Sequence, residues 1–96
     1  MAFRDDYDFD LLVNESEHMV VEELERQLEL PENRDLRRSH DAVLDVAAFA
    51  LNAVPAAYRV NLIGRVYAEE LDRKHGEAVR AAVTRAISVV RANPPA

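Results

Sequence analysis

Apolar residues recur at helical spacing along most of the chain, and three proline-containing stretches interrupt the pattern. The first predicted helix begins after Asn14, a favourable N-cap residue, with Glu17 three positions later as in a capping box. It ends near Leu30, because Pro31 follows and the residue before a proline avoids the helical conformation. Its apolar positions form one stripe, made of Val20, Val21, Leu24 and Leu28. This pattern is typical of a helix that buries one face against a core.

The C-terminal third of the chain predicts two further helices, over residues 63–74 and 77–92, with a break or bend at Gly76 between them. The last helix has the clearest periodicity in the chain, and Asn93 followed by two prolines ends it. Its apolar stripe consists of Val79, Ala82, Val83, Ala86, Ile87 and Val90.

The middle of the chain predicts a helix over residues 42–54. A polar connection over residues 31–41 leads into it, and Ser39 or Asp41 is positioned to cap its first turn. Residues 55–63 follow as a turn and a short irregular or extended piece.

This middle helix is apolar on nearly every face, and only Asp45 and Asn52 interrupt it. The two are seven residues apart, so they lie on one helical face with Phe49 between them, and Pro55 ends the helix. A helix that is apolar all round is suited to burial on every side, and buried polar groups need hydrogen-bonding partners. Asp45 and Asn52 therefore bond a ligand, bond the backbone where helices meet, or fix the register of a dimer; we favour a structural role.

These elements predict an all-α fold, a small bundle of about four helices, because no strand pattern exceeds four residues. The acidic residues 1–12 are interpreted as a flexible arm whose aromatic side chains pin onto the core, and residues 13–96 as the helical domain. Three other helices in a 96-residue chain are too few to cover the middle helix completely. A second copy of the chain is suited to cover it, which predicts a homodimer.

The composition of the chain disfavours several classes of function. The net charge of −6 disfavours general binding of nucleic acid, which requires a basic surface. The chain has no cysteine, hence no disulfide and no thiolate zinc site, and its three histidines, His18, His40 and His75, match no metal-binding spacing. No phosphate-binding glycine loop or nucleophile motif occurs, so an enzyme is not expected. No apolar run is long enough for a membrane helix, and the acidic start argues against a secretory signal, so we expect a cytoplasmic protein.

A more specific pattern runs through the middle of the chain: an aspartate, the triplet Ala-Leu-Asn, a proline and a tyrosine. Its residues are Asp45, Ala50, Leu51, Asn52, Pro55, Tyr58 and, at its end, Val60. Weaker matches flank it on both sides, at Val13, Asn14, Glu17, Val20 and Glu23 before it and at Gly64, Tyr67, Ala86, Val90, Asn93 and Pro94 after it. Together they resemble the late competence development protein ComFB family over roughly residues 12–94.

The resemblance implies a small helical domain that forms a homodimer. Some members of the family are linked to binding cyclic dinucleotides, cyclic di-GMP in particular, whereas others carry a cysteine cluster before the central aspartate and bind zinc. Here the corresponding residues 37–42 read RRSHDA, so the zinc site is not carried over and no metal or other cofactor is expected.

Arginine and tyrosine are the residue types suited to a cyclic dinucleotide. A guanidinium forms paired hydrogen bonds with a phosphate or a guanine edge, and a tyrosine ring stacks on a base. The candidate ligand-binding residues flank the central motif and are Arg37, Arg38, Tyr58, Arg59 and Arg65. The plainer reading of each arginine is a solvated side chain or one paired with the many acidic residues. The candidate residues of the dimer core are Asp45, Phe49 and Asn52.

The function predicted from these residues and the resemblance is a cytoplasmic receptor for cyclic di-GMP or cyclic di-AMP, which relays the messenger to an unidentified partner protein. The alternative is a dimeric protein-interaction module without a small ligand. A nucleic-acid-binding competence factor is the third reading, and the negative charge disfavours it.

Overall fold

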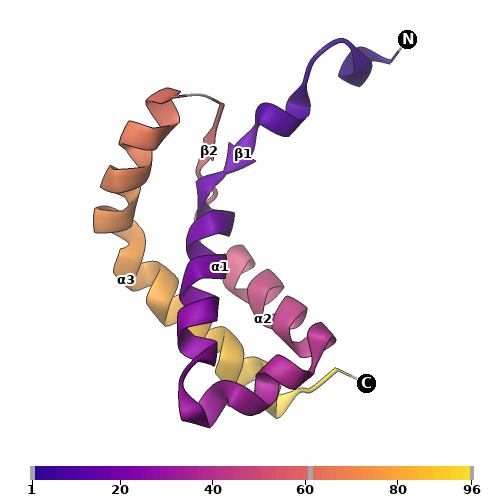
Figure 1. Ribbon diagram of the computed structural model, residues 1–96, viewed down its shortest axis with the longest axis vertical. Coiled ribbons are helices and arrows are strands. Elements are labelled where there is room, and N and C mark those ends of the chain that lie inside the picture. Colours follow the sequence, from indigo (N-terminus) through magenta and orange to yellow (C-terminus); the bar gives the residue numbers. More distant parts are fainter. Residues whose placement is uncertain (1, 61, 96) are drawn as a thin grey trace.

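Helices α1, α2 and α3 pack together in this computed structural model, and a thin N-terminal arm projects from the body they form (Figure 1). The structure describes residues 2–60 and 62–95, and over residues 62–74 it describes the backbone alone. The elements, in chain order, are η1 (Phe3–Asp5), η2 (Phe9–Leu11), β1 (Val13–Asn14), α1 (Glu15–Leu28), η3 (Pro31–Arg38), α2 (His40–Ala53), β2 (Tyr58–Arg59) and α3 (Leu62–Ala92). The predicted class, a small and mostly helical bundle of about four helices, is confirmed, with η3 as the fourth helix of substantial length.

The predicted starts of α1 and α2 are confirmed, and local capping explains them. Asn14 Oδ1 accepts a hydrogen bond from Ser16 N at 3.1 Å, and Ser39 Oγ accepts one from Ala42 N at 3.1 Å. Each bond satisfies an amide that the first turn of a helix leaves without a partner. Ser39, rather than Asp41, is thus the cap of α2.

The polar connection predicted after α1 is a 3₁₀ helix, η3. Pro31 at its start fixes a helix-compatible backbone angle, and Asn33 Nδ2 donates to the Gln27 carbonyl at 3.0 Å. Leu36 is its buried apolar side chain. Arg91 then ties η3 to the end of α3, because its guanidinium donates to both Asp35 carboxylate oxygens at 2.9 Å. These bonds hold the pKa of the Asp35 carboxyl below its usual value.

The predicted break at Gly76, between two separate helices, is wrong. The helix α3 continues from Leu62 to Ala92 through this glycine. A glycine in a helix costs only about 1 kcal/mol relative to alanine and keeps its backbone N–H, so it does not interrupt the hydrogen-bonding pattern. The apolar stripe that begins at Val79 supplies compensating burial directly after it.

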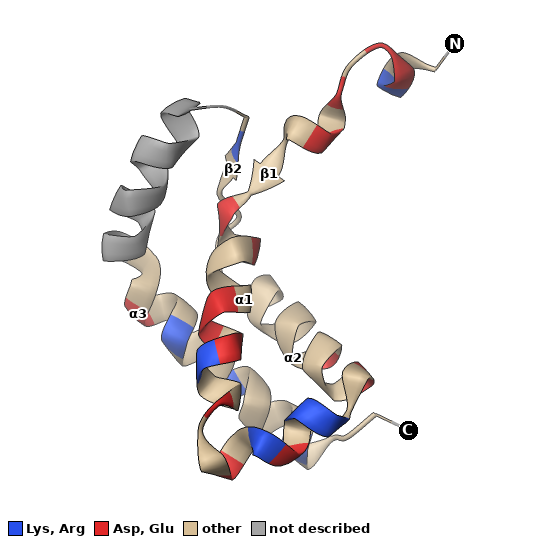
Figure 2. Cartoon of the chain, in the orientation of Figure 1, with Lys and Arg blue, Asp and Glu red and all other residues tan. Residues whose placement is uncertain are grey.

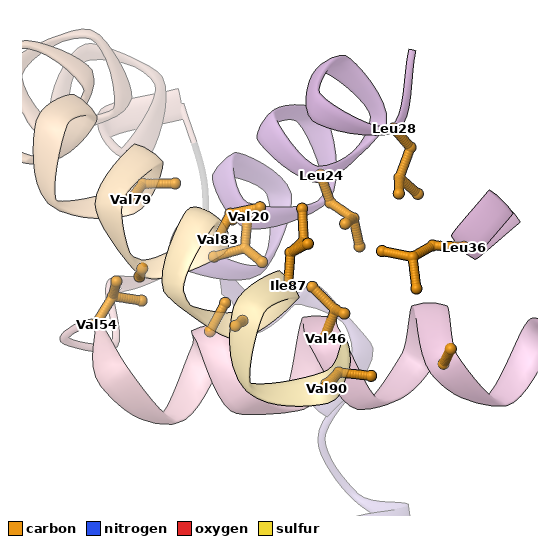
Figure 3. Packing of buried hydrophobic residues seen from close by; sticks show 14 residues of the cluster. Val20, Leu24, Leu28, Leu36, Val46, Val54, Val79, Val83, Ile87 and Val90 are labelled. Carbon is orange, nitrogen blue, oxygen red and sulfur yellow. The ribbon is translucent and has the colours of Figure 1, made fainter. Parts of the chain in front are cut away.

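The core lies where α1, η3, α2 and α3 meet (Figure 3). Valine and leucine side chains fill its centre, and alanines lie where α2 packs against α3. Its buried apolar residues are Val20, Leu24, Leu28, Leu36, Ala42, Val46, Ala50, Val54, Val79, Ala82, Val83, Ala86, Ile87 and Val90. The stripes predicted for α1 and for the end of α3 are therefore the core-facing sides of these helices, except that Val21 is exposed.

One side of α2 stays uncovered in the single chain. Leu44 is 54% exposed, and Asp45 and Asn52 are exposed beside it, with Phe49 half-buried at the edge. The other elements of one chain therefore do not cover this helix completely, as predicted. Asp45 and Asn52, however, face solvent rather than buried partners in the single chain, because the other helices pack against one side of α2 only.

The aromatic residues of the arm do not pin onto the core, contrary to the interpretation made from the sequence. Phe3 and Tyr7 contact each other, with ring centroids 4.8 Å apart, and Phe9 lies beside both. All three rings are exposed. Along the part of the chain that the structure describes, no helix has an apolar stretch of the length that a bilayer requires.

Candidate ligand-binding site

The chain that follows the central proline is fastened to the start of α1. Strands β1 and β2 pair antiparallel, with Asn14 opposite Tyr58 and Val13 opposite Arg59. Asn14 Oδ1, which caps α1, also accepts a hydrogen bond from Ala57 N at 2.8 Å. One side chain thus fixes both the first turn of the helix and the segment that leads into β2.

Residues 15 and 16 strengthen the same junction. Glu15 N donates to the Ala57 carbonyl at 2.7 Å, and Ser16 Oγ donates to the Pro55 carbonyl. Glu15 is a buried residue, only 5% exposed, and Arg59 Nε donates to its carboxylate. A buried carboxylate requires such a partner, because an unpaired charge in the interior is costly. We call the contacts among Asn14, Glu15, Ser16, Pro55, Ala57 and Arg59 the clasp.

The clasp places Tyr58 at the rim of a groove of ≈ 510 Å³. Side chains directly opposite each other in an antiparallel pair lie on the same side of the sheet, so Tyr58 and Asn14 are neighbours. Tyr58 is 64% exposed. The groove lies between the end of the arm, the paired strands and the first turns of α1, and its lining residues are Leu12, Val13, Asn14, Glu17, His18, Val21 and Tyr58.

Of the five predicted ligand-binding residues, Tyr58 and Arg59 lie together at this junction. Tyr58 faces the groove, whereas the Arg59 side chain is 30% exposed and bonds Glu15. Arg59 thereby has a role in the fold that sequence reasoning did not foresee. Arg65 lies outside the residues whose side chains the structure describes.

Arg37 and Arg38 lie on η3, at the other end of α1 from the groove (Figure 1). The 14 residues of α1 separate the two places by roughly 20 Å. Arg37 Nη1 is 2.8 Å from Glu29 Oε1 in an exposed ion pair, and Arg38 is exposed. Figure 2 shows basic residues on η3 and acidic residues along the arm. A single chain therefore does not bring all the predicted ligand-binding residues together.

The pairing of Glu15 with Arg59 is not visible in the sequence pattern. No local spacing rule relates two residues 44 positions apart. The groove itself was also missed, since its lining comes from the arm, two strands and a helix. Within the described residues, no group of three or more His, Asp or Glu side chains is arranged to hold a metal ion.

Comparison with known proteins agrees with the arrangement of elements described above. The family model for the late competence development protein ComFB matches residues 13–94, from β1 to just beyond the end of α3. The arm lies before the matched region. No curated protein matches the chain.

Proposed function

The chain belongs to the late competence development protein ComFB family, and from this premise we propose that it is a cytoplasmic receptor for a cyclic dinucleotide of the cyclic di-GMP type. It catalyses no reaction and relays the bound messenger to a partner protein. The observation that carries the proposal is the exposed Tyr58, held by the clasp at the rim of a groove at the end of the central motif. An exposed aromatic ring, carried beside a groove by a backbone that strand pairing holds in place, is suited to stack on a nucleotide base.

The phosphates require cations, and the exposed arginines of η3 are suited to supply them. Arg38 has no ion-pair partner among the residues that the structure describes, and the exposed pair between Arg37 and Glu29 is weak enough to exchange for a phosphate. In one chain these arginines are too far from Tyr58 to share a ligand. A second copy of the chain that packs antiparallel on α2 would bring its η3 arginines close to Tyr58 of the first copy.

We propose that two chains pack through the uncovered side of α2 about a two-fold axis perpendicular to the helix. The η3 end of one copy then lies beside the Tyr58 end of the other, so that both ends contribute to each ligand site. With the axis between Ala48 and Phe49, Asp45 lies opposite Asn52 of the partner subunit, and the reverse pair is equivalent. A carboxylate and an amide form a good hydrogen-bonded pair, which gives both polar residues a partner and fixes the register.

The second candidate function is a dimeric protein-interaction module without a small ligand. The uncovered side of α2, where Leu44 and Ala48 are exposed and Phe49 is half-buried, favours it as much as it favours the dimeric receptor, because a contiguous apolar surface is suited to a protein contact. The two functions share the dimer and differ in the ligand, so they are separated by the binding experiment below.

Cyclic di-GMP is expected to stabilise the folded chain. At about 100 times its dissociation constant, a ligand that binds only the folded state raises the free energy of unfolding by about 2.7 kcal/mol. For a domain of this size, that corresponds to a rise in melting temperature of roughly 10–20 °C. Differential scanning fluorimetry measures this rise with cyclic di-GMP and cyclic di-AMP, and the linear dinucleotide serves as the control. If no cyclic dinucleotide changes the melting temperature at about 100 µM, the interaction module is the better account.

Asn52→Asp is expected to weaken the dimer while leaving the folded monomer intact. Light scattering should give the wild type twice the 10.9 kDa of one chain. The variant places two carboxylates opposite each other, which should raise the dimer dissociation constant by roughly tenfold or more. The double variant Asp45→Asn, Asn52→Asp exchanges the two groups and should restore the wild-type value. A double variant as weak as the single one would contradict the antiparallel register.

A further inference from the structure

The N-terminal arm, residues 2–12, carries aromatic side chains that the body of its own chain does not cover. Phe3 is 66% exposed, and Tyr7 and Phe9 pack only on it and on each other. The hydrogen bonds described for the arm join arm residues to one another. The family match begins at residue 13, so the arm is a feature of this chain outside the matched domain. A cluster of three exposed rings is typical of a surface that contacts another macromolecule.

The arm is also strongly acidic. It holds one arginine, Arg4, against four aspartates, Asp5, Asp6, Asp8 and Asp10. Among the residues that the structure describes, no ion pair joins these aspartates to a cation. The Arg4 guanidinium lies instead over the Phe9 ring, with its central carbon 5.4 Å from the ring centroid. Carboxylates and aromatic faces both attract guanidinium groups, so the arm is suited to a surface rich in arginine.

The surface of η3 offers such arginines. Arg34, Arg37 and Arg38 are all exposed there. Arg34 and Arg38 form no ion pair within the described part of the chain, and Arg37 forms only the exposed pair with Glu29. In Figure 2 the basic residues of η3 and the acidic residues of the arm lie at opposite ends of the molecule. The two surfaces are therefore complementary in charge but far apart in one chain.

Contact between the arm and η3 of the same chain is disfavoured. The arm points away from η3, and α1 separates the two by roughly 20 Å (Figure 1). To fold back, the arm would have to follow α1, whose exposed acidic residues are Glu17, Glu22, Glu25 and Glu29. Arg26 is exposed on the same helix, but Glu23 already pairs with it. The carboxylates of α1 would repel the aspartates of the arm along this path.

A second copy of the chain places an η3 surface within reach of the arm. In the antiparallel packing proposed above, η3 of one chain lies beside the Tyr58 end of the other. The arm leaves the body at that same end, because β1, which follows it, pairs with the strand that holds Tyr58. An extended chain spans about 3.3 Å per residue, so residues 2–12 can reach up to roughly 36 Å from this point.

We propose that the arm of each chain crosses to η3 of the second copy, where its aspartates pair with Arg34 and Arg38 and its rings lie against their guanidinium groups. Exchange of the two arms about the two-fold axis makes both contacts equivalent. The inference rests on the dimer that forms part of the proposed function. It describes the dimer without ligand, since Arg38 is also suited to bind a phosphate.

The test is paramagnetic relaxation enhancement between two copies of the full chain, without ligand. The chain has no cysteine, so Ala2→Cys provides a single site for a nitroxide label at an exposed position of the arm. An excess of this chain is mixed with nitrogen-15-labelled wild type, so that only contacts between copies broaden the observed amide signals. The signals of η3, residues 31–38, should lose intensity and regain it when the nitroxide is reduced.

Charge variants test the pairing itself. Arg34→Gln with Arg38→Gln in the observed chain should remove the broadening while the fold is kept, because exposed arginines contribute little to stability. Arg85→Gln is the matched control, since Arg85 is an exposed arginine on α3, and it should leave the broadening unchanged. Asp6→Arg with Asp10→Arg in the nitroxide chain should remove the broadening of wild-type η3. Pairing that chain with Arg34→Asp, Arg38→Asp should restore it.

Light scattering on the same samples distinguishes failure of the arm contact from failure of the dimer. If the chain is a dimer and the η3 signals are the same with oxidised and reduced label, the arm contact is wrong and the dimer stands. Broadening confined to another surface, or kept in the double glutamine variant, would also overturn the pairing with these arginines. If the chain is a monomer, the dimer and the arm contact both fail, whereas ligand binding is tested separately by fluorimetry.

Discussion

Arg59→Ala is expected to lower the free energy of unfolding by about 3 kcal/mol, at the low end of the range for removing one partner of a buried ion pair. The variant leaves the Glu15 carboxylate buried without the guanidinium that now bonds it. The low end applies because Arg59 keeps a 30% exposed side chain, so water partly replaces the lost contact. Urea denaturation followed by circular dichroism measures the change. It is a large fraction of the stability of a small domain.

Two controls distinguish the effect of leaving a buried carboxylate unpaired from the effect of losing any ion pair. Arg37→Ala also removes an arginine from an ion pair, but its partner Glu29 is exposed, so the loss should stay below about 1 kcal/mol. The double variant Glu15→Leu, Arg59→Leu removes both charges and should recover most of the stability lost in Arg59→Ala. Equal losses for Arg59→Ala and Arg37→Ala would mean that the Glu15 pair contributes no more than a surface pair.

The same result determines how ligand binding by Arg59 variants is interpreted. A variant that unfolds loses every ligand, whether or not the arginine contacts it. Loss of cyclic di-GMP binding in Arg59→Ala would therefore not assign Arg59 to the ligand site. The double leucine variant is the better probe, because it should keep the fold while lacking the guanidinium. Binding retained there would place Arg59 in the clasp alone.

The parts of the fold that the sequence predicts are those set by neighbouring residues. Asn14 and Ser39 cap their helices through bonds to residues two and three positions away, and the apolar stripe from Val79 to Val90 is visible in the spacing alone. The break predicted at Gly76 was wrong because the continuity of the helix there depends on distant contacts rather than on neighbouring residues. A glycine weakens a helix locally, but burial of the residues that follow it overrides this preference, and such burial is a tertiary effect.

The candidate site was predictable only in part, because its contacts join distant positions. Tyr58 was found through the motif after Pro55, but its neighbour across the strand pair, Asn14, is 44 residues away and was interpreted as a cap alone. The cap is only half of what Asn14 does, since its oxygen also binds Ala57 N. Sequence spacing predicts the bond from Ser16 N, two residues away, but not the bond from Ala57 N, which is distant in the chain.

Asn14→Ala should therefore cost about 2–4 kcal/mol, more than an ordinary helix cap. The loss of the cap accounts for about 1 kcal/mol. The Ala57 amide, left without an acceptor at a half-buried position, accounts for roughly 1–3 kcal/mol more. Urea denaturation of the variant beside Ser39→Ala, which removes a cap that bonds one amide only, tests this difference. Similar losses for the two variants would show that the bond to Ala57 contributes nothing.

Asn14→Asp separates the two ends of the same side chain. Aspartate keeps the acceptor oxygen for both backbone amides and places a negative charge at the start of a helix, so the free energy of unfolding should stay within about 1 kcal/mol of the wild type. It also replaces the Nδ2 amide in the lining of the groove by a second carboxylate oxygen, whose negative charge would repel the phosphates of a cyclic dinucleotide. The variant should thus fold like the wild type and bind cyclic di-GMP roughly tenfold or more weakly. Calorimetry that shows unchanged affinity in this folded variant would confine Asn14 to the clasp and remove it from the proposed ligand site.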